Sequence, residues 1–229
     1  MTELPRPSWP EFLATFSRRW KQGEHVFING QTGSGKTELL LQLVNMRTYG
    51  VVFVTKPRDP IFKSPFAKGY TRMTKWAPSG TTRKVLLAPR EGDSTQAQVG
   101  NQREVFHDAL NKTYKDGGWT IGVDETLWIA NRLKLSALVG DASFMGRALG
   151  ITVISATQRP AHIPVIVPQS ATHAFLAKTG RASDLKTLAE LGGDPREVAS
   201  ALKSLRNKHE FLYVDTAGEL PLQVINTRA

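Results

Sequence analysis

A glycine-rich octapeptide, set between an apolar run and a helical pattern, constrains this chain more than any other feature. The octapeptide is Gly30–Thr37, GQTGSGKT, and it satisfies the pattern G-x-x-x-x-G-K-[ST]. "HVFIN" precedes it and "ELLLQLV" follows it, so it joins a predicted strand to a predicted helix. Glycines let backbone N–H groups turn onto phosphate oxygens, and a helix N-terminus adds its positive dipole end. The placement predicts a binding site for a nucleoside triphosphate, and the alternative is a glycine-rich structural turn.

Two residues at the end of the octapeptide have separate predicted roles. Lys36 places a point charge on the phosphates and is also a catalytic candidate, and the Thr37 hydroxyl is suited to ligate Mg²⁺. The nucleotide would be ATP. The candidate ATP-binding residues are Gly30, Gln31, Thr32, Gly33, Ser34, Gly35, Lys36, Thr37 and Glu38.

A second motif, "TIGVDE" at residues 120–125, ends a predicted strand with two acids. Successive side chains at a strand end point in different directions, so the two carboxylates can serve different partners. We assign Asp124 to Mg²⁺ and Glu125 to the attacking water as general base. The alternative is a pair of acids that only caps the passage from strand to helix. The pair favours hydrolysis over transfer to an acceptor with its own hydroxyl.

A third motif, "ISATQRP" at residues 154–160, places Gln158 just after another predicted strand. A neutral polar side chain at that tip could reach the γ-phosphate or its water. An exposed coil residue is the alternative.

Strand and helix patterns alternate along most of the chain, which predicts an α/β fold with a mostly parallel central sheet flanked by helices. The chain is expected to form one domain over 1–229, with an N-terminal helix within 1–23 and the core over 24–229. Expected strands are 25–29, 51–55, 84–88, 119–124, 151–156 and 172–177, and expected helices are about 8–21, 36–47, 95–115 and 127–149. Two capped helices and a C-terminal β-hairpin around residues 215–218 are expected in the last third.

Positive charge gathers in one segment, residues 56–90, which we call the basic segment. The whole chain has a formal net charge of +10, and the basic segment holds nine basic residues and one acid, a net charge of +8. A localised block of this kind suggests a polyanion partner, and a solvated surface is the alternative. Interleaved aromatic residues could stack on exposed bases; they are Phe62, Phe66, Tyr70 and Trp76.

The chain lacks features of several other protein classes. It has no cysteine, so disulfides and zinc-thiolate sites are excluded. No apolar run reaches about 18 residues, so no transmembrane segment is expected, and no secretory signal is visible at the N-terminus. We therefore expect a cytoplasmic protein.

Taken together, the P-loop, "VDE" and "GRALGITVISATQRP" at residues 146–160 resemble the FtsK/HerA superfamily of ring-forming DNA translocases. The last stretch is the most discriminating, since many P-loop proteins share the first two motifs. The resemblance runs from about residue 24 to the end and is weakest in the basic segment. In size the chain is most similar to viral genome-packaging ATPases, since it shows neither the membrane anchor nor the winged-helix module of larger members.

The resemblance implies a RecA-like P-loop NTPase fold of the additional-strand, catalytic-glutamate type. It also implies that Gln158 is a sensor and that Arg147 reaches the ATP of a neighbouring subunit in a homo-oligomeric, hexameric ring. A guanidinium supplied in trans would neutralise charge developing on the γ-phosphoryl group. The alternative is that Arg147 caps a helix C-terminus before Gly150.

A DNA motor has to hold phosphates without reading sequence, and Lys and Arg do this. The candidate DNA-binding residues are Lys63, Lys68, Arg72 and Lys75 in the basic segment, and Arg132 and Lys134 in a second loop. These charges could instead face outward or meet a capsid or portal protein.

The leading hypothesis is therefore an ATP-hydrolysing motor that moves double-stranded DNA, as in packaging of a viral or mobile-element genome in the host cytoplasm or in association with the virion. The alternatives are a phage-morphogenesis or secretion ATPase acting on protein, a conjugative DNA-transfer ATPase, and a small-molecule or nucleotide kinase. The Asp124–Glu125 pair argues against the kinase.

Overall fold

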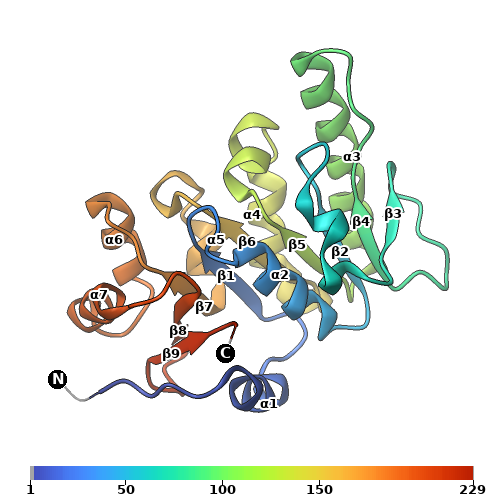
Figure 1. Ribbon diagram of the computed structural model, residues 1–229. Helices are drawn as coiled ribbons and strands as arrows, with labels where there is room; N and C mark the ends of the chain where they lie inside the picture. Colours follow the sequence, from blue (N-terminus) through green and yellow to red (C-terminus); the bar gives the residue numbers. More distant parts are fainter. Residues whose placement is uncertain (1–2, 229) are drawn as a thin grey trace.

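A computed structural model describes residues 3–228, and residues 1, 2 and 229 of the expected domain lie outside the described part. A nine-stranded sheet in the order β3-β4-β2-β5-β6-β1-β7-β8-β9 runs through the molecule (Figure 1). The strands are β1 (His25–Asn29), β2 (Gly50–Phe53), β3 (Thr71–Met73), β4 (Lys84–Leu87), β5 (Thr120–Val123), β6 (Thr152–Thr157), β7 (Ala171–Ala177), β8 (Glu210–Asp215) and β9 (Gln223–Asn226).

The seven strands from β3 to β7 in the sheet order pair in parallel, and β8 pairs antiparallel with both β7 and β9. The antiparallel pair β8–β9 is the expected C-terminal hairpin. The central strands β1, β2, β5 and β6 are buried along their whole length, which is why they read as continuous apolar runs. The expected α/β fold with a mostly parallel sheet is confirmed.

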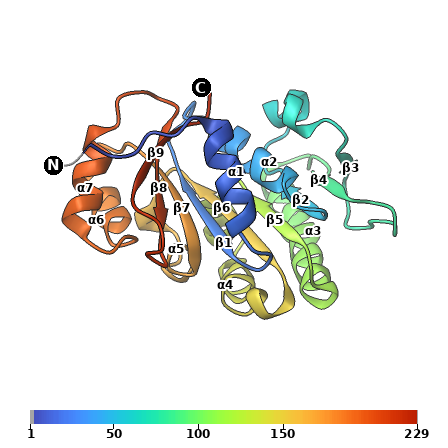
Figure 2. The same cartoon turned by 90° about the horizontal axis from the view of Figure 1, so that it is seen from below.

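Helices cover both faces of the sheet. The helices are α1 (Trp9–Arg19), α2 (Lys36–Asn45), α3 (Thr95–Asp116), α4 (Ser136–Met145), α5 (Ile166–Gln169), α6 (Ala182–Ala189) and α7 (Pro195–Ser204). Figure 2 shows α1 and α2 on one face and α3, α4 and α5 on the opposite face. Two apolar cores follow from this layering, one on each side of the sheet.

The start of α1 follows from its sequence. The Glu11 carboxylate accepts hydrogen bonds from the backbone N–H and the hydroxyl of Ser8, at 2.9 and 2.8 Å. The apolar face of the helix buries Phe12 and Phe16, which stack 5.4 Å apart and contact Tyr213 of β8 edge-on. The N-terminal helix is thereby joined to the C-terminal hairpin.

The expected helix over 127–149 is only partly correct. One turn of π-helix (Trp128–Arg132) comes first, then α4, then a 3₁₀ turn (Gly146–Leu149). The break lies at Lys134, whose φ of +57° does not fit a helix, between the buried side chains of Leu133 and Leu135. Burying both leucines takes precedence over continuing the helix.

The basic segment is ordered in spite of its prolines, which disfavour long helices and central strands. It includes two 3₁₀ turns (Pro60–Lys63 and Pro65–Ala67) as well as the edge strand β3. Within residues 3–228, no helix combines the length and the apolar character needed to cross a bilayer.

Candidate functional site

The predicted motifs meet at one edge of the sheet because they follow the carboxyl ends of neighbouring parallel strands. The P-loop follows β1, Gln158 follows β6, and Asp124 and Glu125 follow β5. The order β2-β5-β6-β1 makes these strands adjacent, so the residues converge although up to 128 positions separate Gly30 from Gln158. We call this the carboxyl edge.

The glycines of the P-loop adopt backbone conformations that other residues avoid. Gly33 and Gly35 have φ angles of +78° and +89°, and Gly35 is the N-cap of α2. A Cβ atom on Gly30 would lie 2.3 Å from the Ser34 hydroxyl oxygen. The Ser34 hydroxyl is itself buried without a hydrogen-bond partner in the structure. The loop is therefore closely wound, with a polar group directed inward.

The residues assigned to Mg²⁺ lie together. The Thr37 hydroxyl donates a 2.8 Å hydrogen bond to Asp124 Oδ2, and Lys36 Nζ is 3.7 Å from Asp124 Oδ1. Asp124 Oδ1 is buried and has no hydrogen-bond partner in the structure. Burial raises the pKa of Asp124, and the Lys36 charge and the Thr37 hydrogen bond only partly oppose this. An unsatisfied buried carboxylate oxygen beside a threonine hydroxyl fits a hard divalent cation.

Glu125 lies in a chain of polar contacts that ends at the P-loop. Its Oε1 atom accepts a 2.8 Å hydrogen bond from Lys56 Nζ and a 3.1 Å hydrogen bond from Gln158 Nε2. The Thr32 hydroxyl donates to Gln158 Oε1 at 3.2 Å. Gln158 thus lies between Thr32 and Glu125 and joins the P-loop to the end of β5.

A cavity of about 430 Å³ opens beside these residues. It is lined by P-loop residues, by Asp124 and Gln158, and by the first turns of the basic segment, including Lys56, Asp59 and Lys63. We call it the nucleotide cavity. Lys63, a predicted DNA contact, therefore borders the nucleotide side of the segment.

Three residues near the P-loop were not predicted from the sequence. Lys208 Nζ would lie 2.8 Å from a Cβ on Gly33, and His209 Nδ1 lies 3.1 Å from the Ser34 carbonyl oxygen. The buried Glu210 carboxylate accepts backbone N–H bonds from Arg206 and Asn207, at 2.6 and 3.1 Å, and so holds this loop in place. Burial works against its charged form, but these bonds and Arg6 prevail and lower the pKa of Glu210. No local sequence pattern predicts these contacts, because the loop between α7 and β8 is far from the P-loop in sequence.

Arg147 lies at the opposite edge of the sheet, because it comes before β6 and Gln158 comes after it. Its side chain is 70% exposed and its closest acid is Glu24, 3.9 Å away. The 3₁₀ turn ends at Gly150 with a φ of +64°, and the Gly150 N–H bonds to the Arg147 carbonyl oxygen. The guanidinium cannot contribute to the nucleotide cavity of its own subunit. Apart from the long ion pair with Glu24, its side chain faces solvent.

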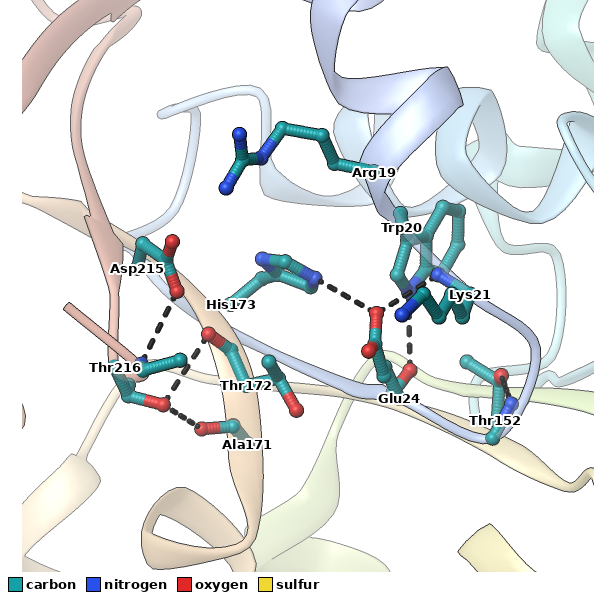
Figure 3. Close-up of polar contacts among 12 residues, drawn as sticks. Arg19, Trp20, Lys21, Glu24, Thr152, Ala171, Thr172, His173, Asp215 and Thr216 are labelled. Atoms are coloured by element: carbon teal, nitrogen blue, oxygen red, sulfur yellow. Dashed lines mark hydrogen bonds and ion pairs between the residues drawn. The ribbon is translucent and has the colours of Figure 1, made fainter. Parts of the chain in front are cut away.

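This opposite edge, the amino edge, has its own buried polar cluster (Figure 3). Glu24 Oε2 accepts a hydrogen bond from the backbone N–H of Lys21 at 2.8 Å and lies 3.4 Å from His173 Nε2. His173 Nδ1 lies 2.9 Å from the Tyr213 hydroxyl. Burial lowers the pKa of His173. These contacts tie β7 and β8 to the turn before β1.

The basic candidates have different environments. All six are exposed, namely Lys63, Lys68, Arg72, Lys75, Arg132 and Lys134. Arg72 also lies over the Phe62 ring, with its guanidinium carbon 4.1 Å from the centroid. Lys84 at the end of the segment bonds the carbonyl oxygens of Val44 and Arg47 and so caps α2. The Lys84 charge counts in the +8 total, but its ammonium group is already bonded to these two carbonyl oxygens.

The expectation of base-stacking aromatics needs correction. Trp76 is 4% exposed and packs edge-on against Trp119, so it belongs to the core. Phe62, Phe66 and Tyr70 are half-buried against the core on the α2 side, and the Tyr70 hydroxyl bonds Asn45. These rings anchor the basic segment to the sheet, because a segment with few strands has to bury its apolar side chains to stay ordered.

No protein-family model matches the sequence, and the search of curated proteins gave no match. Solved structures do match. The DNA-packaging ATPase B204 of Sulfolobus turreted icosahedral virus superposes with a TM-score of 0.64 at 20% identity, over 90% of this chain and 98% of B204. This chain shares the B204 fold. The genome-packaging NTPase B204 of Sulfolobus turreted icosahedral virus 2, in complex with AMPPCP, gives a TM-score of 0.61 at 15% identity, over 89% of this chain and 97% of that one.

A secretion ATPase also has a similar fold. The cytoplasmic domain of the type VII secretion ATPase EccC from Thermomonospora curvata matches with a TM-score of 0.58 at 15% identity. The match covers 92% of this chain and 26% of EccC. The expected P-loop ATPase fold is thus shared with packaging and secretion ATPases of known structure.

Proposed function

We propose that this chain is an ATP-hydrolysing motor that moves double-stranded DNA as a homo-oligomeric ring, in genome packaging for a virus or mobile element. The observation that carries the proposal is the convergence of Lys36, Asp124 and Gln158 at the carboxyl edge of a sheet with the B204 fold. The strands belong to one sheet, which supports treating residues 1–229 as one ATPase domain. The motor would act in the host cytoplasm, beside a capsid or portal protein.

The chain's own residues divide the chemistry among them. The P-loop N–H groups and Lys36 hold the phosphates, and Thr37 and Asp124 would hold Mg²⁺, which neutralises charge on the phosphate oxygens. Glu125 takes a proton from the attacking water as general base. Gln158, already bonded to Glu125 and Thr32, orients that water against the γ-phosphate.

Arg147 completes the site of the neighbouring subunit. Its exposed side chain lies at the amino edge, so ring formation has to bring the amino edge of one subunit to the carboxyl edge of the next. A guanidinium supplied in this way stabilises transition-state charge and makes hydrolysis depend on assembly. The proposed ring is a hexamer.

DNA would be held by the exposed cations of the basic segment and by Arg132 and Lys134. Phosphate contacts of this kind release counterions, so binding weakens steeply as salt rises. Neutralising Lys68, Arg72 and Lys75 together should weaken duplex binding. The plot of log affinity against log salt should become shallower, its slope losing about 3 in magnitude. Each phosphate that is no longer neutralised accounts for roughly 0.9 of that magnitude.

The test is ATP turnover with and without long duplex DNA. The proposed motor is stimulated by long duplex DNA, and the triple neutralised variant loses the stimulation while keeping its DNA-free turnover. Lys36→Ala serves as the inactive control. ATP turnover that long DNA leaves unchanged contradicts a DNA motor.

A secretion ATPase acting on protein is the second candidate, because EccC matches over 92% of this chain. The +8 basic segment favours DNA. Turnover stimulated by a folded or unfolded protein, and not by DNA, would reverse this preference.

A further inference from the structure

We propose that Phe144 is the anchor by which one subunit docks on the next, and that its ring fills a cavity beside Glu125 in a second copy of this chain. Asp141, on the same helix, would meet the cations that line that cavity. The inference rests on the proposed ring, and it adds the side chains that hold two neighbouring subunits together.

An apolar patch surrounds Arg147 at the amino edge. Five large apolar side chains are exposed in residues 3–228, and four of them come from α3, from α4 and from the 3₁₀ turn that holds Arg147. These four are Tyr114, Phe144, Met145 and Leu149, and Phe144 is the most exposed, at 73%. The Tyr114 hydroxyl lies 3.6 Å from Met145 Sδ, so the two helices contribute to one patch. Apolar side chains that gather in this way, rather than lie scattered singly, mark a surface that binds another molecule.

Three side chains share one face of the helix that carries this patch. Asp141, Phe144 and Arg147 follow at intervals of three residues, and residues at this spacing are neighbours on a helix surface. One turn, roughly 5 Å along the axis, separates Phe144 from Arg147. Asp141 is exposed, and the ion pairs within residues 3–228 do not include it. The face therefore presents an acid, a ring and a cation in order.

The carboxyl edge has a cavity whose lining complements this face. It measures about 620 Å³ and is lined by residues of the turns that follow β5 and β6; we call it the side cavity. Leu127 and Trp128 supply apolar surface, while Arg132 and Arg159 supply positive charge. Cavities of about 300–1,000 Å³ accommodate whole small molecules, so a phenylalanine side chain fits together with its neighbours.

The side cavity and the nucleotide cavity adjoin each other. Glu125 lines the side cavity, Gln158 lines the nucleotide cavity, and Gln158 Nε2 donates a 3.1 Å hydrogen bond to Glu125 Oε1. A subunit that inserts Phe144 into the side cavity therefore brings Arg147 to the nucleotide cavity of the same partner. The 70% exposed Arg147 side chain is not fixed by its own contacts, so the apolar anchor would set its place.

Charge favours a second copy over DNA as the occupant of the side cavity. The Glu125 carboxylate in its lining would repel a phosphodiester, and Asp141 beside the apolar patch would repel one as well. Between two subunits the same groups attract, because Asp141 of one meets Arg132 and Arg159 of the other. A ring and an acid on one helix face thus fit an apolar cavity with two cations.

A cross-link tests the contact directly, because the chain has no cysteine of its own. The double variant Phe144→Cys/Asn131→Cys replaces the anchor and one residue of the side-cavity wall. Oxidation with copper–phenanthroline in the presence of a non-hydrolysable ATP analogue should give disulfide-linked multimers on a denaturing gel. The matched control Glu104→Cys/Asn131→Cys moves the first cysteine to an exposed position of α3 outside the patch and should stay monomeric. Equal cross-linking in both variants, or none in an assembled ring, overturns the proposal.

Phe144→Ala tests the anchor without a covalent bond. Sedimentation with the ATP analogue, over a range of protein concentrations, gives the concentration of half-assembly. It should rise at least about tenfold in Phe144→Ala, the scale expected when a buried interface anchor is truncated, and much less in Phe144→Leu, which stays apolar. Thermal unfolding should not change, since the side chain is exposed in the single subunit. Equal assembly of Phe144→Ala and the parent contradicts the anchor role.

Charge reversal tests the part played by Asp141. Asp141→Arg should weaken assembly, and the added change Arg132→Asp should restore it, whereas Glu104→Arg, a reversal at an exposed acid outside the patch, should have no effect. A double variant no better than Asp141→Arg removes Asp141 from the contact. A parent chain that stays monomeric with both the ATP analogue and long DNA refutes the proposed ring and the docking with it. A parent that assembles while Phe144→Ala assembles equally well refutes the docking alone.

Discussion

The two edges of the sheet are built in different ways. The carboxyl edge is made of short sequence motifs and leaves buried polar atoms unsatisfied, namely Ser34 Oγ and Asp124 Oδ1. The amino edge joins distant residues, and its buried groups Glu24, His173 and Tyr213 bond one another. The contrast is one of degree, because His25 Nε2 at the amino edge is also buried without a hydrogen-bond partner. Most polar groups of the amino edge hold strands together, whereas the unused atoms of the carboxyl edge lie in and beside the predicted phosphate-binding loop. Arg147 is the exception, an exposed cation at the amino edge.

Arg147→Ala is the strongest way to break this comparison. If Arg147 serves a neighbour, turnover of the assembled protein should fall about 10⁴-fold, the scale of an arginine supplied in trans. Stability should hardly change, since the side chain is 70% exposed. Mixing Arg147→Ala with Lys36→Ala subunits should restore part of the activity, because some interfaces regain both residues. Mixtures that stay inactive contradict a shared site.

Glu125→Gln tests the reactive side of the carboxyl edge. Turnover should fall about 10³-fold, as expected on loss of a general base, while nucleotide affinity stays near that of the parent. The measurement is single-turnover hydrolysis together with binding of a non-hydrolysable ATP analogue. Hydrolysis that survives the change would remove Glu125 from the mechanism.

The pH dependence of stability tests whether the buried His25 of the amino edge has a structural role. Burial lowers the pKa of His25 to about 4, and its Nδ1 accepts a 3.0 Å hydrogen bond from the Val153 N–H. The folded protein therefore disfavours the charged ring, so stability is full above pH 6.5 and is lost as pH falls towards 4. The loss should be on the order of 3 kcal/mol, at about 1.4 kcal/mol for each pKa unit of the shift.

Thermal unfolding at pH 7 and pH 4.5 measures this effect. The variant His25→Asn should unfold with a smaller difference between the two pH values. Part of the difference should persist, because burial also lowers the pKa of His173. An equal pH dependence in parent and variant would show that His25 does not contribute.

Gly35→Ala and Gly218→Ala should give the smallest effects of these tests. Both glycines have positive φ, +89° and +74°, so alanine should cost each about 1 kcal/mol of stability. A Cβ at Gly35 would lie 3.2 Å from His209 Nδ1, whereas one at Gly218 meets nothing within 4 Å. Nucleotide affinity should fall only in Gly35→Ala, as titration of an ATP analogue would show. Equal losses of affinity would contradict a phosphate-binding loop.

Sequence patterns locate residues best where the chemistry is local. The P-loop glycines, Lys36 and Thr37 are contiguous, and Asp124 and Glu125 close an apolar strand, so motif and periodicity are enough to place them at strand ends. The C-terminal hairpin and the parallel sheet follow from the same patterns.

The sequence could not reveal contacts that depend on strand order. Lys56 meets Glu125 only because β2 lies beside β5, and Lys208 reaches the P-loop only through the turn before β8. The charged neighbours of Trp76 predict an exposed ring, yet the ring fills a gap beside Trp119. Burial of a single aromatic residue in an irregular segment is set by tertiary packing, which composition does not record.

Strand β6 has one further consequence. Its six residues, roughly 20 Å of extended backbone, lie between the 3₁₀ turn that holds Arg147 and Gln158, which directly follows the strand. In the proposed ring, one end of this strand senses the ATP bound by its own subunit and the other end touches the ATP of the next. Each subunit would then carry a stiff buried strand between two consecutive ATP sites. A change in the tilt of that strand would pass the state of one site to the next and so set the order of ATP hydrolysis around the ring.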